Sequence, residues 1–262
     1  MIPARKRWGQ HFLARDETAD RITAATGVGP EDTVIEVGPG EGALTRALLR
    51  RGARVLGIEI DPLRAEALRL ELEGDSRARI LRGDALQKTP GEWLDEAGWD
   101  GRAVLVANLP YNVATPVLTR AIEDGRVSRS VATIQREVAR RLAARPGGDD
   151  YGYLSVRVAA WARARILFDL PPGAFRPRPR VVSSVVELAP REPPLETPLR
   201  SRALHLASLG FRTRRKTLPN ALASAGAREL WEGALAEIGR GPKTRAEELS
   251  LEDYLSLARL AP

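Results

Sequence analysis

Cysteine is absent from this chain of 262 residues, and histidine occurs only twice, as His11 and His205. The absence of cysteine excludes disulfide bonds, thiolate metal sites and thiol nucleophiles, and two histidines are too few for a histidine-rich metal site. We therefore expect no metal ion. No apolar run approaches the length of a membrane span, and Trp8-Gly9-Gln10-His11 stands where a secretory signal would need apolar residues. These features favour a cytoplasmic protein with no membrane partner.

Acidic residues are outnumbered, since 41 Lys and Arg against 34 Asp and Glu give a formal net charge of +7. Almost all of the positive charge is Arg, whose planar guanidinium suits phosphate oxygens and stacking on bases. A basic domain of this kind indicates a polyanionic partner. A GC-rich genome is the alternative explanation for the use of Arg in place of Lys. Nothing in the sequence requires a dimer, so we expect a monomer.

Short apolar runs rich in β-branched residues alternate with amphipathic segments up to Leu188. We expect strands at 33–37, 54–60, 79–81, 103–107 and 131–134, with helices at 43–49, 62–72, 116–122 and 136–144. This alternation predicts an α/β fold, a parallel sheet covered by helices on both faces. The runs at 164–170 and 181–188 have no long helix between them, so we expect the sheet to end in an antiparallel pair.

A charged segment rich in proline, 189–198, has no periodicity and is expected to be a linker. Beyond it, residues 199–260 have helical spacing and no strand-like run. We therefore predict two domains, an α/β domain at 1–188 and a small helical domain at 199–262.

A glycine-rich loop, Gly38-Pro39-Gly40-Glu41-Gly42, lies between the first expected strand and the first expected helix. Glycines let the backbone turn tightly and let a ligand approach closely. Glu59 ends the next strand, where a carboxylate can accept hydrogen bonds from both hydroxyls of a ribose. Asp84, followed by Ala85, ends the third strand, where a carboxylate can receive an adenine amine.

The charge within the loop bears on the identity of this ligand. Glu41 disfavours a pyrophosphate and is tolerable beside a sulfonium cation, so the pattern predicts binding of S-adenosylmethionine. The loop also fits a loose dinucleotide fingerprint, which makes a nicotinamide cofactor the alternative. A plain glycine turn with two solvated carboxylates is the alternative that involves no ligand.

The tetrad Asn108-Leu109-Pro110-Tyr111 follows the fourth expected strand. The exocyclic amine of adenine is a poor nucleophile, because its lone pair is conjugated with the ring. We expect the Asn108 side-chain oxygen and the Leu109 carbonyl to accept hydrogen bonds from that amine as its nitrogen pyramidalises. Pro110 stiffens the loop, and Tyr111 offers a face on which an extruded base can stack. Positioning would carry the rate without a histidine base; the alternative is an ordinary Asn-Pro turn with a core tyrosine.

Several further blocks carry a family resemblance. They are Lys6–Leu13, Asn108–Asn112 with Thr115-Pro116, Gln135–Leu142, Tyr151–Val156, Phe175–Val181, Phe211 with Arg214–Thr217 and Asn220, and Arg245–Ser250. In these blocks the chain resembles the ribosomal RNA adenine dimethyltransferases of the small-subunit type, which modify two adjacent adenines in a hairpin near the end of the RNA. The resemblance implies a Rossmann-like class I methyltransferase sheet with a small C-terminal helical domain. It also implies S-adenosylmethionine as cofactor, small-subunit ribosomal RNA as partner, and a part in ribosome maturation.

The same resemblance implies roles for single residues. The cofactor contacts would be His11, Leu13, Gly38, Glu59, Asp84 and Asn108, and the loop and strand pattern adds Gly40 and Ala85. Phe175 would stack on the target base. The chain departs from the family where His11 replaces a usual Asn, Ala114 a usual Ser, Val182 an acidic residue and Pro219 a basic residue.

Basic residues gather in three places, at 5–7, 176–180 and 212–216. From their motif context we expect RNA phosphates to be bound by Arg176, Arg178, Arg214, Arg215 and Lys216. A solvated basic face is the alternative for each cluster.

Three other functions remain open. A large-subunit ribosomal RNA methyltransferase of the antibiotic-resistance type shares the fold and the chemistry. A nicotinamide-dependent oxidoreductase would explain the glycine loop and Glu59, but it leaves the Asn108 tetrad without a role. A non-catalytic ribosome-assembly factor could use the same scaffold.

Overall fold

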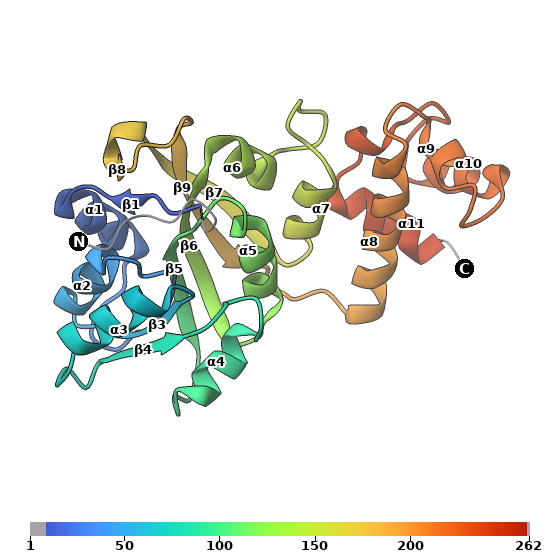
Figure 1. The fold of residues 1–262 in the computed structure, drawn as a ribbon. Coiled ribbons are helices and arrows are strands. Elements are labelled where there is room, and N and C mark those ends of the chain that lie inside the picture. The colour runs from blue at the N-terminus through green and yellow to red at the C-terminus, as the bar shows by residue number, and fades with distance from the viewer. Residues whose placement is uncertain (1–8, 261–262) are drawn as a thin grey trace. The chain divides into compact units, whose positions relative to one another are not determined.

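The structure is a computed structural model that describes residues 9–260. The basic cluster at 5–7 and the start of the block at Lys6 therefore lie outside the described residues. The chain divides into two compact units (Figure 1). One comprises the residues up to Ala139 together with Arg165–Ala189, and the other comprises Arg140–Ala164 and the residues from Pro190 onward.

A seven-stranded sheet in the order β4-β3-β2-β5-β6-β9-β7 forms the centre of the first unit. Its strands are β2 (Thr33–Val37), β3 (Arg54–Glu59), β4 (Ala78–Arg82), β5 (Ala103–Asn108), β6 (Val127–Gln135), β7 (Ala162–Leu170) and β9 (Ser183–Pro190). The pairs from β4 to β6 are parallel, and β9 runs antiparallel to β6. The expected α/β class is confirmed. The antiparallel strand is β9, and no α-helix lies between it and the preceding long strand β7.

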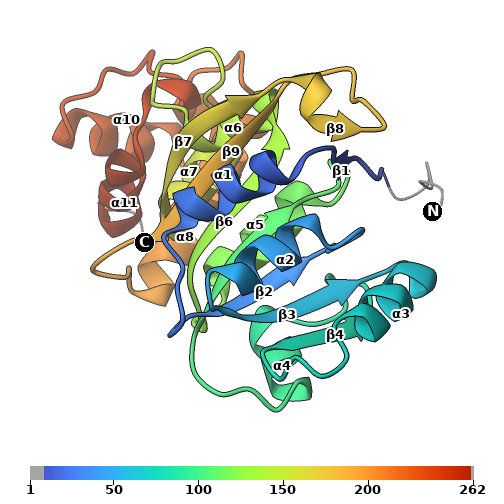
Figure 2. The ribbon, with the colours of Figure 1, turned by 90° about the vertical axis from the view of Figure 1, so that its left-hand side faces the viewer.

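Helices cover both faces of this sheet. On one face lie α1 (Asp16–Thr26), α2 (Ala43–Arg50) and α3 (Pro62–Glu71) (Figure 2). Ile22, Leu44 and Leu48 belong to one core cluster with the strand residues Val34 and Val104. On the other face Ile35 and Leu105 lie near Trp93 of α4 (Pro90–Glu96) and Val117 of α5 (Ala114–Glu123). Because alternate strand residues face opposite sides, both sets of strand positions must be apolar, as the continuous apolar runs predicted.

Local signals set several helix starts. Asp61 accepts from the backbone N–H of Leu63 and is followed by Pro62 at the first position of α3. Thr89 and Glu92 form a capping box at the start of α4. Helix α1 was not expected, because small and threonine side chains make up most of its buried face: Ala19, Ile22, Thr23 and Thr26.

Two short strands tie the start of the described chain to a distant loop. β1 (Phe12–Leu13) pairs antiparallel with β8 (Phe175–Arg176), which follows a 3₁₀ turn, η2 (Pro172–Ala174). Phe12 lies opposite Arg176, and Leu13 lies opposite Phe175. The N-terminal segment is therefore fixed to the loop between β7 and β9.

The second unit is helical and has its own core. Its elements are α7 (Tyr153–Ala159), α8 (Thr197–Arg212), α9 (Leu218–Ala221), α10 (Arg228–Glu237), η3 (Ala246–Glu248) and α11 (Leu251–Leu260), with α6 (Arg136–Ala143) crossing the boundary between units. Trp231 and Tyr254 are among its largest fully buried side chains. No strand is found beyond Pro190 in the described residues, in line with the helical spacing of that region.

The boundary of this unit differs from the expected one. The sequence assigned all residues up to Leu188 to the α/β domain, yet Arg140–Ala164 belongs to the helical unit. Val156 and Ala160 join the helical core, and the Tyr151 hydroxyl donates to the carbonyl of Leu249 across 2.8 Å. The chain therefore passes from one unit to the other at three places, after Ala139, Ala164 and Ala189, and the expected linker 189–198 contains only the last of them.

Candidate active site

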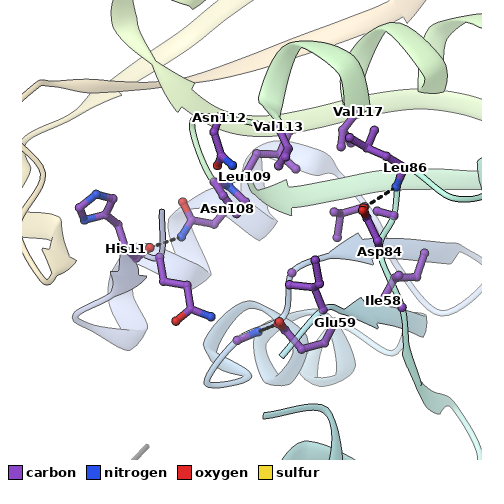
Figure 3. Close-up of a pocket in the computed structure, with 18 of the residues that line it drawn as sticks. His11, Ile58, Glu59, Asp84, Leu86, Asn108, Leu109, Asn112, Val113 and Val117 are labelled. Atoms are coloured by element: carbon purple, nitrogen blue, oxygen red, sulfur yellow. Dashed lines mark hydrogen bonds between the residues drawn. The ribbon is translucent and has the colours of Figure 1, made fainter. Parts of the chain in front are cut away.

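A cavity of about 250 Å³ opens at the carboxyl edge of the sheet in the first unit (Figure 3). The strand order reverses between β2 and β5, which is where open α/β sheets bind their ligands. The cavity is lined by the ends of β2, β3 and β5, by the loop after β4, by α5 and by the N-terminal segment. The lining residues are Gln10, His11, Phe12, Val37, Gly38, Gly40, Ile58, Glu59, Ile60, Gly83, Asp84, Ala85, Leu86, Asn108, Leu109, Pro110, Asn112, Val113 and Val117.

The glycine loop bends sharply and lies against the N-terminal segment. Gly38, Gly40 and Gly42 all have positive φ, a conformation that other residues rarely adopt. At Gly40 the φ angle is 59°, and a Cβ atom there would lie 2.7 Å from Cε1 of the Phe12 ring. Glycine is therefore needed at Gly40 both for the turn and for the close approach of Phe12.

Glu59 is almost fully buried and is anchored by the backbone. Its Oε2 accepts from the N–H of Gly40 across 2.8 Å, and its Oε1 accepts from the N–H of Asp61 across 2.9 Å. Burial raises the pKa of Glu59 above its usual value, while these two amide bonds act in the opposite direction. Each carboxylate oxygen has a second lone pair, so the group can also accept from two ligand hydroxyls.

Glu36, one residue before the end of β2, is a second buried carboxyl group behind the loop. Its Oε2 accepts from the Thr45 hydroxyl across 2.7 Å. Desolvation by burial raises the pKa of Glu36 to about 8, against the lowering effect of that hydrogen bond. Glu36 is therefore largely protonated at neutral pH and adds little negative charge beneath the loop.

Asp84 lines the cavity on the side away from Asn108, near apolar side chains (Figure 3). Its Oδ1 accepts from the backbone N–H of Leu86 across 2.9 Å, which fixes the carboxylate (Figure 3). Ile58, Leu86 and Val117 line the same cavity. A fixed carboxylate beside an apolar slot suits a flat heterocycle that carries an amine.

The tetrad begins at the last residue of β5, and its first three residues line the cavity. The Asn108 Nδ2 donates to the backbone carbonyl of His11 across 2.7 Å (Figure 3). Leu109 is buried, and its N–H donates to the carbonyl of Thr133 across 3.1 Å. The Tyr111 hydroxyl shares a 2.7 Å hydrogen bond with the Ser183 hydroxyl, and burial raises the pKa of Tyr111 above its usual value.

Most of the expected cofactor residues meet at this cavity. His11, Gly38, Gly40, Glu59, Asp84, Ala85 and Asn108 all line it, as do Leu109 and Pro110 of the tetrad. Leu13 does not line it; it borders a smaller neighbouring cavity of about 20 Å³. Tyr111 is half-buried beside the cavity, with its ring centroid 5.4 Å from that of His11.

Phe175 does not fit its expected role in this structure. Its side chain is 2% exposed, and it packs in the core cluster with Leu170, Ala174 and Val185. Since the ring fills the core beneath β1, the described conformation gives it no open face on which a base could stack. It supports the segment that carries Leu13, its partner in the β1–β8 pair.

The expected RNA-binding residues are all exposed. Arg176 and Arg178 lie in the first unit, on β8 and just after it. Arg214, Arg215 and Lys216 follow α8 in the second unit, where the Arg214 Nε lies 3.9 Å from Oε2 of Glu247. The structure thus leaves these guanidinium and ammonium groups accessible to a polyanion.

The sequence pattern missed several cavity residues and one tyrosine partner. Gln10, Phe12, Ile60, Leu86, Asn112, Val113 and Val117 line the cavity, and Ser183 holds Tyr111. Gln10, Phe12 and Asn112 lie inside blocks that resemble the family, so proximity to those blocks was the available signal. Ile60, Leu86, Val113 and Val117 are ordinary apolar residues that only the fold brings together.

The described residues contain neither a metal-binding cluster nor a membrane-spanning helix. Within residues 9–260, no group of three or more His, Asp or Glu side chains is arranged to hold a metal ion. No helix in that same range combines the length and apolarity needed to cross a membrane.

Comparison with known proteins agrees with the geometry of the cavity. Residues 1–261 match the family model described as ribosomal RNA adenine dimethylase. The chain is 41% identical to ribosomal RNA small subunit methyltransferase A of Methylococcus capsulatus over 256 residues, which cover 97% of this chain and 96% of that protein. It is also 41% identical to the protein of the same name from Rubrobacter xylanophilus, with 97% and 94% covered.

Two solved structures are similar over nearly the whole chain. The 23S rRNA methyltransferase ErmE has a TM-score of 0.75 and 26% identity, and the match covers 95% of this chain and 99% of ErmE. A dimethyladenosine transferase from Plasmodium falciparum has a TM-score of 0.79 and 23% identity, with 94% and 96% covered, and supports the fold. On the family match, the level of identity and the near-complete coverage, this chain belongs to the ribosomal RNA adenine dimethylase family.

Proposed function

We propose that this enzyme transfers methyl groups from S-adenosylmethionine to the exocyclic amine of adenines in small-subunit ribosomal RNA. The observation that carries the proposal is the convergence of Glu59, Asp84 and Asn108 on one cavity at the carboxyl edge of the sheet. The relatives at 41% identity are named as small-subunit methyltransferases, which favours the small subunit as the source of the substrate. Dimethylation is part of the proposal because the family is described as a dimethylase.

The chemistry of the cavity fits the proposed cofactor. Glu59 would hold the ribose hydroxyls with the lone pairs that its two amide bonds leave available. Asp84, whose Oδ1 is occupied by the Leu86 amide, would receive the adenine amine at its other oxygen. When bound, S-adenosylmethionine supplies an electrophilic methyl group on a sulfonium.

The tetrad would orient the nucleophile. Asn108 Oδ1 and the Leu109 carbonyl would accept from the two N–H bonds of the target amine and favour a pyramidal nitrogen, whose lone pair is then available for attack. Pro110 keeps the loop rigid. Tyr111, held by Ser183, would present its ring to the extruded base. These groups lower the barrier by positioning, which is worth several orders of magnitude in rate when the geometry is fixed before reaction.

The RNA would be held mainly through its phosphates. Arg176 and Arg178 on the first unit, and Arg214, Arg215 and Lys216 on the second, are the proposed contacts. Phosphate contacts of this kind supply affinity and depend strongly on salt. Because the substrate is ribosomal RNA, we propose that the enzyme acts in the cytoplasm.

A large-subunit substrate is the second candidate, and the similarity to the 23S rRNA methyltransferase ErmE favours it. One experiment separates the two: incubate the protein with labelled S-adenosylmethionine and each unmethylated ribosomal subunit, then map the modified base. We expect label on adenine of the small subunit. Label on the large subunit alone would support the second candidate, and binding of NAD in preference to S-adenosylmethionine would contradict both.

A further inference from the structure

The side chain of Asn108 has two unlike ends, and only one of them suits the proposed reaction. The Oδ1 end accepts hydrogen bonds, as the adenine amine requires, whereas the Nδ2 end only donates. Which end faces the substrate is therefore decisive. A contact within the protein must select that orientation if Asn108 has the role proposed above.

The backbone carbonyl of His11 provides the selection. Asn108 Nδ2 lies 2.7 Å from this oxygen and donates to it. Because the carboxamide is planar, Oδ1 then lies on the other side of the group. A half-turn of the amide would bring Oδ1 against the His11 carbonyl at the same distance, with two acceptors and no proton between them.

The imidazole of His11 fixes the peptide that carries this carbonyl. His11 Nδ1 lies 2.7 Å from the carbonyl oxygen of Pro177. That oxygen can only accept, so Nδ1 carries the proton and donates. The ring also lies beside Tyr111, with 5.4 Å between the centroids and 31° between the planes. One side chain thus connects the tetrad tyrosine, the loop after β8 and the partner of Asn108.

The residue that follows His11 is fixed as well. Phe12 pairs with Arg176 across the β1–β8 ladder, and its ring lies against Gly40. The Arg64 guanidinium lies 4.1 Å from the centroid of the same ring. The His11 carbonyl is therefore held from both its own side chain and the next residue.

We propose that His11 is a positioning residue, whose Nδ1–H bond to Pro177 holds the carbonyl that keeps Asn108 Oδ1 directed at the substrate amine. This role is distinct from a cofactor contact. An asparagine at the same place would offer an Nδ2–H near the position of the histidine Nδ1–H. The bond to Pro177 should thus survive in His11→Asn and be lost in His11→Ala and His11→Phe.

The orientation of Asn108 can be read without RNA or turnover. The chain contains only three asparagines, Asn108, Asn112 and Asn220, so asparagine labelled with nitrogen-15 gives three side-chain amide pairs in an NMR spectrum of the full chain. The Asn108 pair is identified by its loss in Asn108→Ala. We expect one slowly exchanging Asn108 amide proton in the wild type and in His11→Asn, and fast exchange in His11→Ala and His11→Phe. His205→Ala, the exposed histidine of α8, is the matched control and should leave the signal unchanged.

Single-turnover rates give the functional test. A small misplacement of a reacting group can cost up to about 100-fold, so we expect His11→Ala and His11→Phe to slow methylation by roughly 10- to 100-fold, with His11→Asn restoring most of the rate. In an Asn108→Ala background, His11→Ala should add no further loss. Unchanged Asn108 exchange in His11→Ala and His11→Phe, or losses that multiply in the double variant, would overturn the proposal. A wild type that fails to methylate adenine would contradict the proposed function, and the amide spectrum would then still decide the role of His11.

Discussion

The backbone N–H of Gly40 donates to Glu59 Oε2 across 2.8 Å, so the carboxylate that ends β3 holds the glycine loop that follows β2. Glu59 therefore serves the loop as well as the proposed ribose. Removing the side chain takes an acceptor from two backbone amides and, in the proposed complex, from two ribose hydroxyls.

The first prediction follows from this contact. Glu59→Ala should weaken binding of S-adenosylmethionine by roughly 10- to 100-fold, since hydrogen bonds to a charged acceptor contribute about 1.5–3 kcal/mol. Titration calorimetry of the folded variant measures the effect. Glu73→Ala, which removes an exposed carboxylate after α3, is the control and should bind like the wild type. Unchanged affinity in Glu59→Ala would show that Glu59 does not hold the cofactor.

The second prediction concerns pH. The folded-state pKa of Glu36 is raised by burial to about 8, well above its unfolded value, so its contribution to stability is complete at acidic pH. That contribution is lost as the pH rises toward 8, with a slope of up to about 1.4 kcal/mol per pH unit. Glu36→Gln keeps a neutral group that can accept from Thr45.

Urea unfolding of both proteins at several pH values checks this second prediction. Relative to Glu36→Gln, the wild type should lose unfolding free energy between pH 5 and pH 8, because over this range the Glu36 carboxyl is ionised in the unfolded chain and still largely protonated in the folded one. Parallel stability profiles for the two proteins would contradict the buried, protonated state of Glu36.

Much of this site could be predicted from the sequence, for a local reason. The loop at Gly38, the carboxylates Glu59 and Asp84, and Asn108 each follow an apolar strand, and parallel strands bring their carboxyl ends to one edge. A polar residue directly after an apolar strand is therefore enough to predict its place at the carboxyl edge of the sheet. The strand positions at 33–37 and 103–107 were recognisable because both sheet faces are covered and the runs are continuously apolar.

What the sequence could not predict depends on distant contacts. His11 meets Pro177, and Leu13 meets Phe175, across separations that no local pattern encodes. The burial of Phe175 follows from that pairing. The motif alone does not reveal the pairing, so it led to the expectation of an exposed ring that stacks on a base. Likewise, the segment 140–164 contains apolar residues suited to either unit, and only the packing of Val156 and Ala160 assigns it to the helical one.

The third prediction separates two roles of Tyr111. If the ring stacks on the base, Tyr111→Ala should slow methylation by roughly 10- to 100-fold, because base stacking on an aromatic side chain is worth about 1–3 kcal/mol. Tyr111→Phe keeps the ring and loses only the bond to Ser183, so it should retain most of the rate. Ser183→Ala should match Tyr111→Phe, and the double variant should be no slower. A severe loss in Tyr111→Phe would mean that the hydroxyl itself takes part.

The fourth prediction concerns the basic turn after α8. Replacing Arg214, Arg215 and Lys216 by Ala should weaken RNA binding and reduce the slope of log affinity against log salt by roughly 2 to 3. Cofactor affinity should stay unchanged, since the cavity lies entirely in the first unit. A triple variant of the exposed Arg202, Arg228 and Lys243 removes the same charge from the same unit and should have a smaller effect. Equal effects of the two triple variants would indicate a diffuse basic face.

The central claim is that Asn108 accepts from the adenine amine as the methyl group is transferred. The direct measurement is the single-turnover methylation rate of Asn108→Ala at saturating RNA and cofactor, with Asn220→Ala as the control. An acceptor that acts mainly in the transition state predicts a rate about 100- to 1000-fold below the wild type with nearly unchanged RNA affinity. A rate for Asn108→Ala close to that of the wild type would contradict the mechanism.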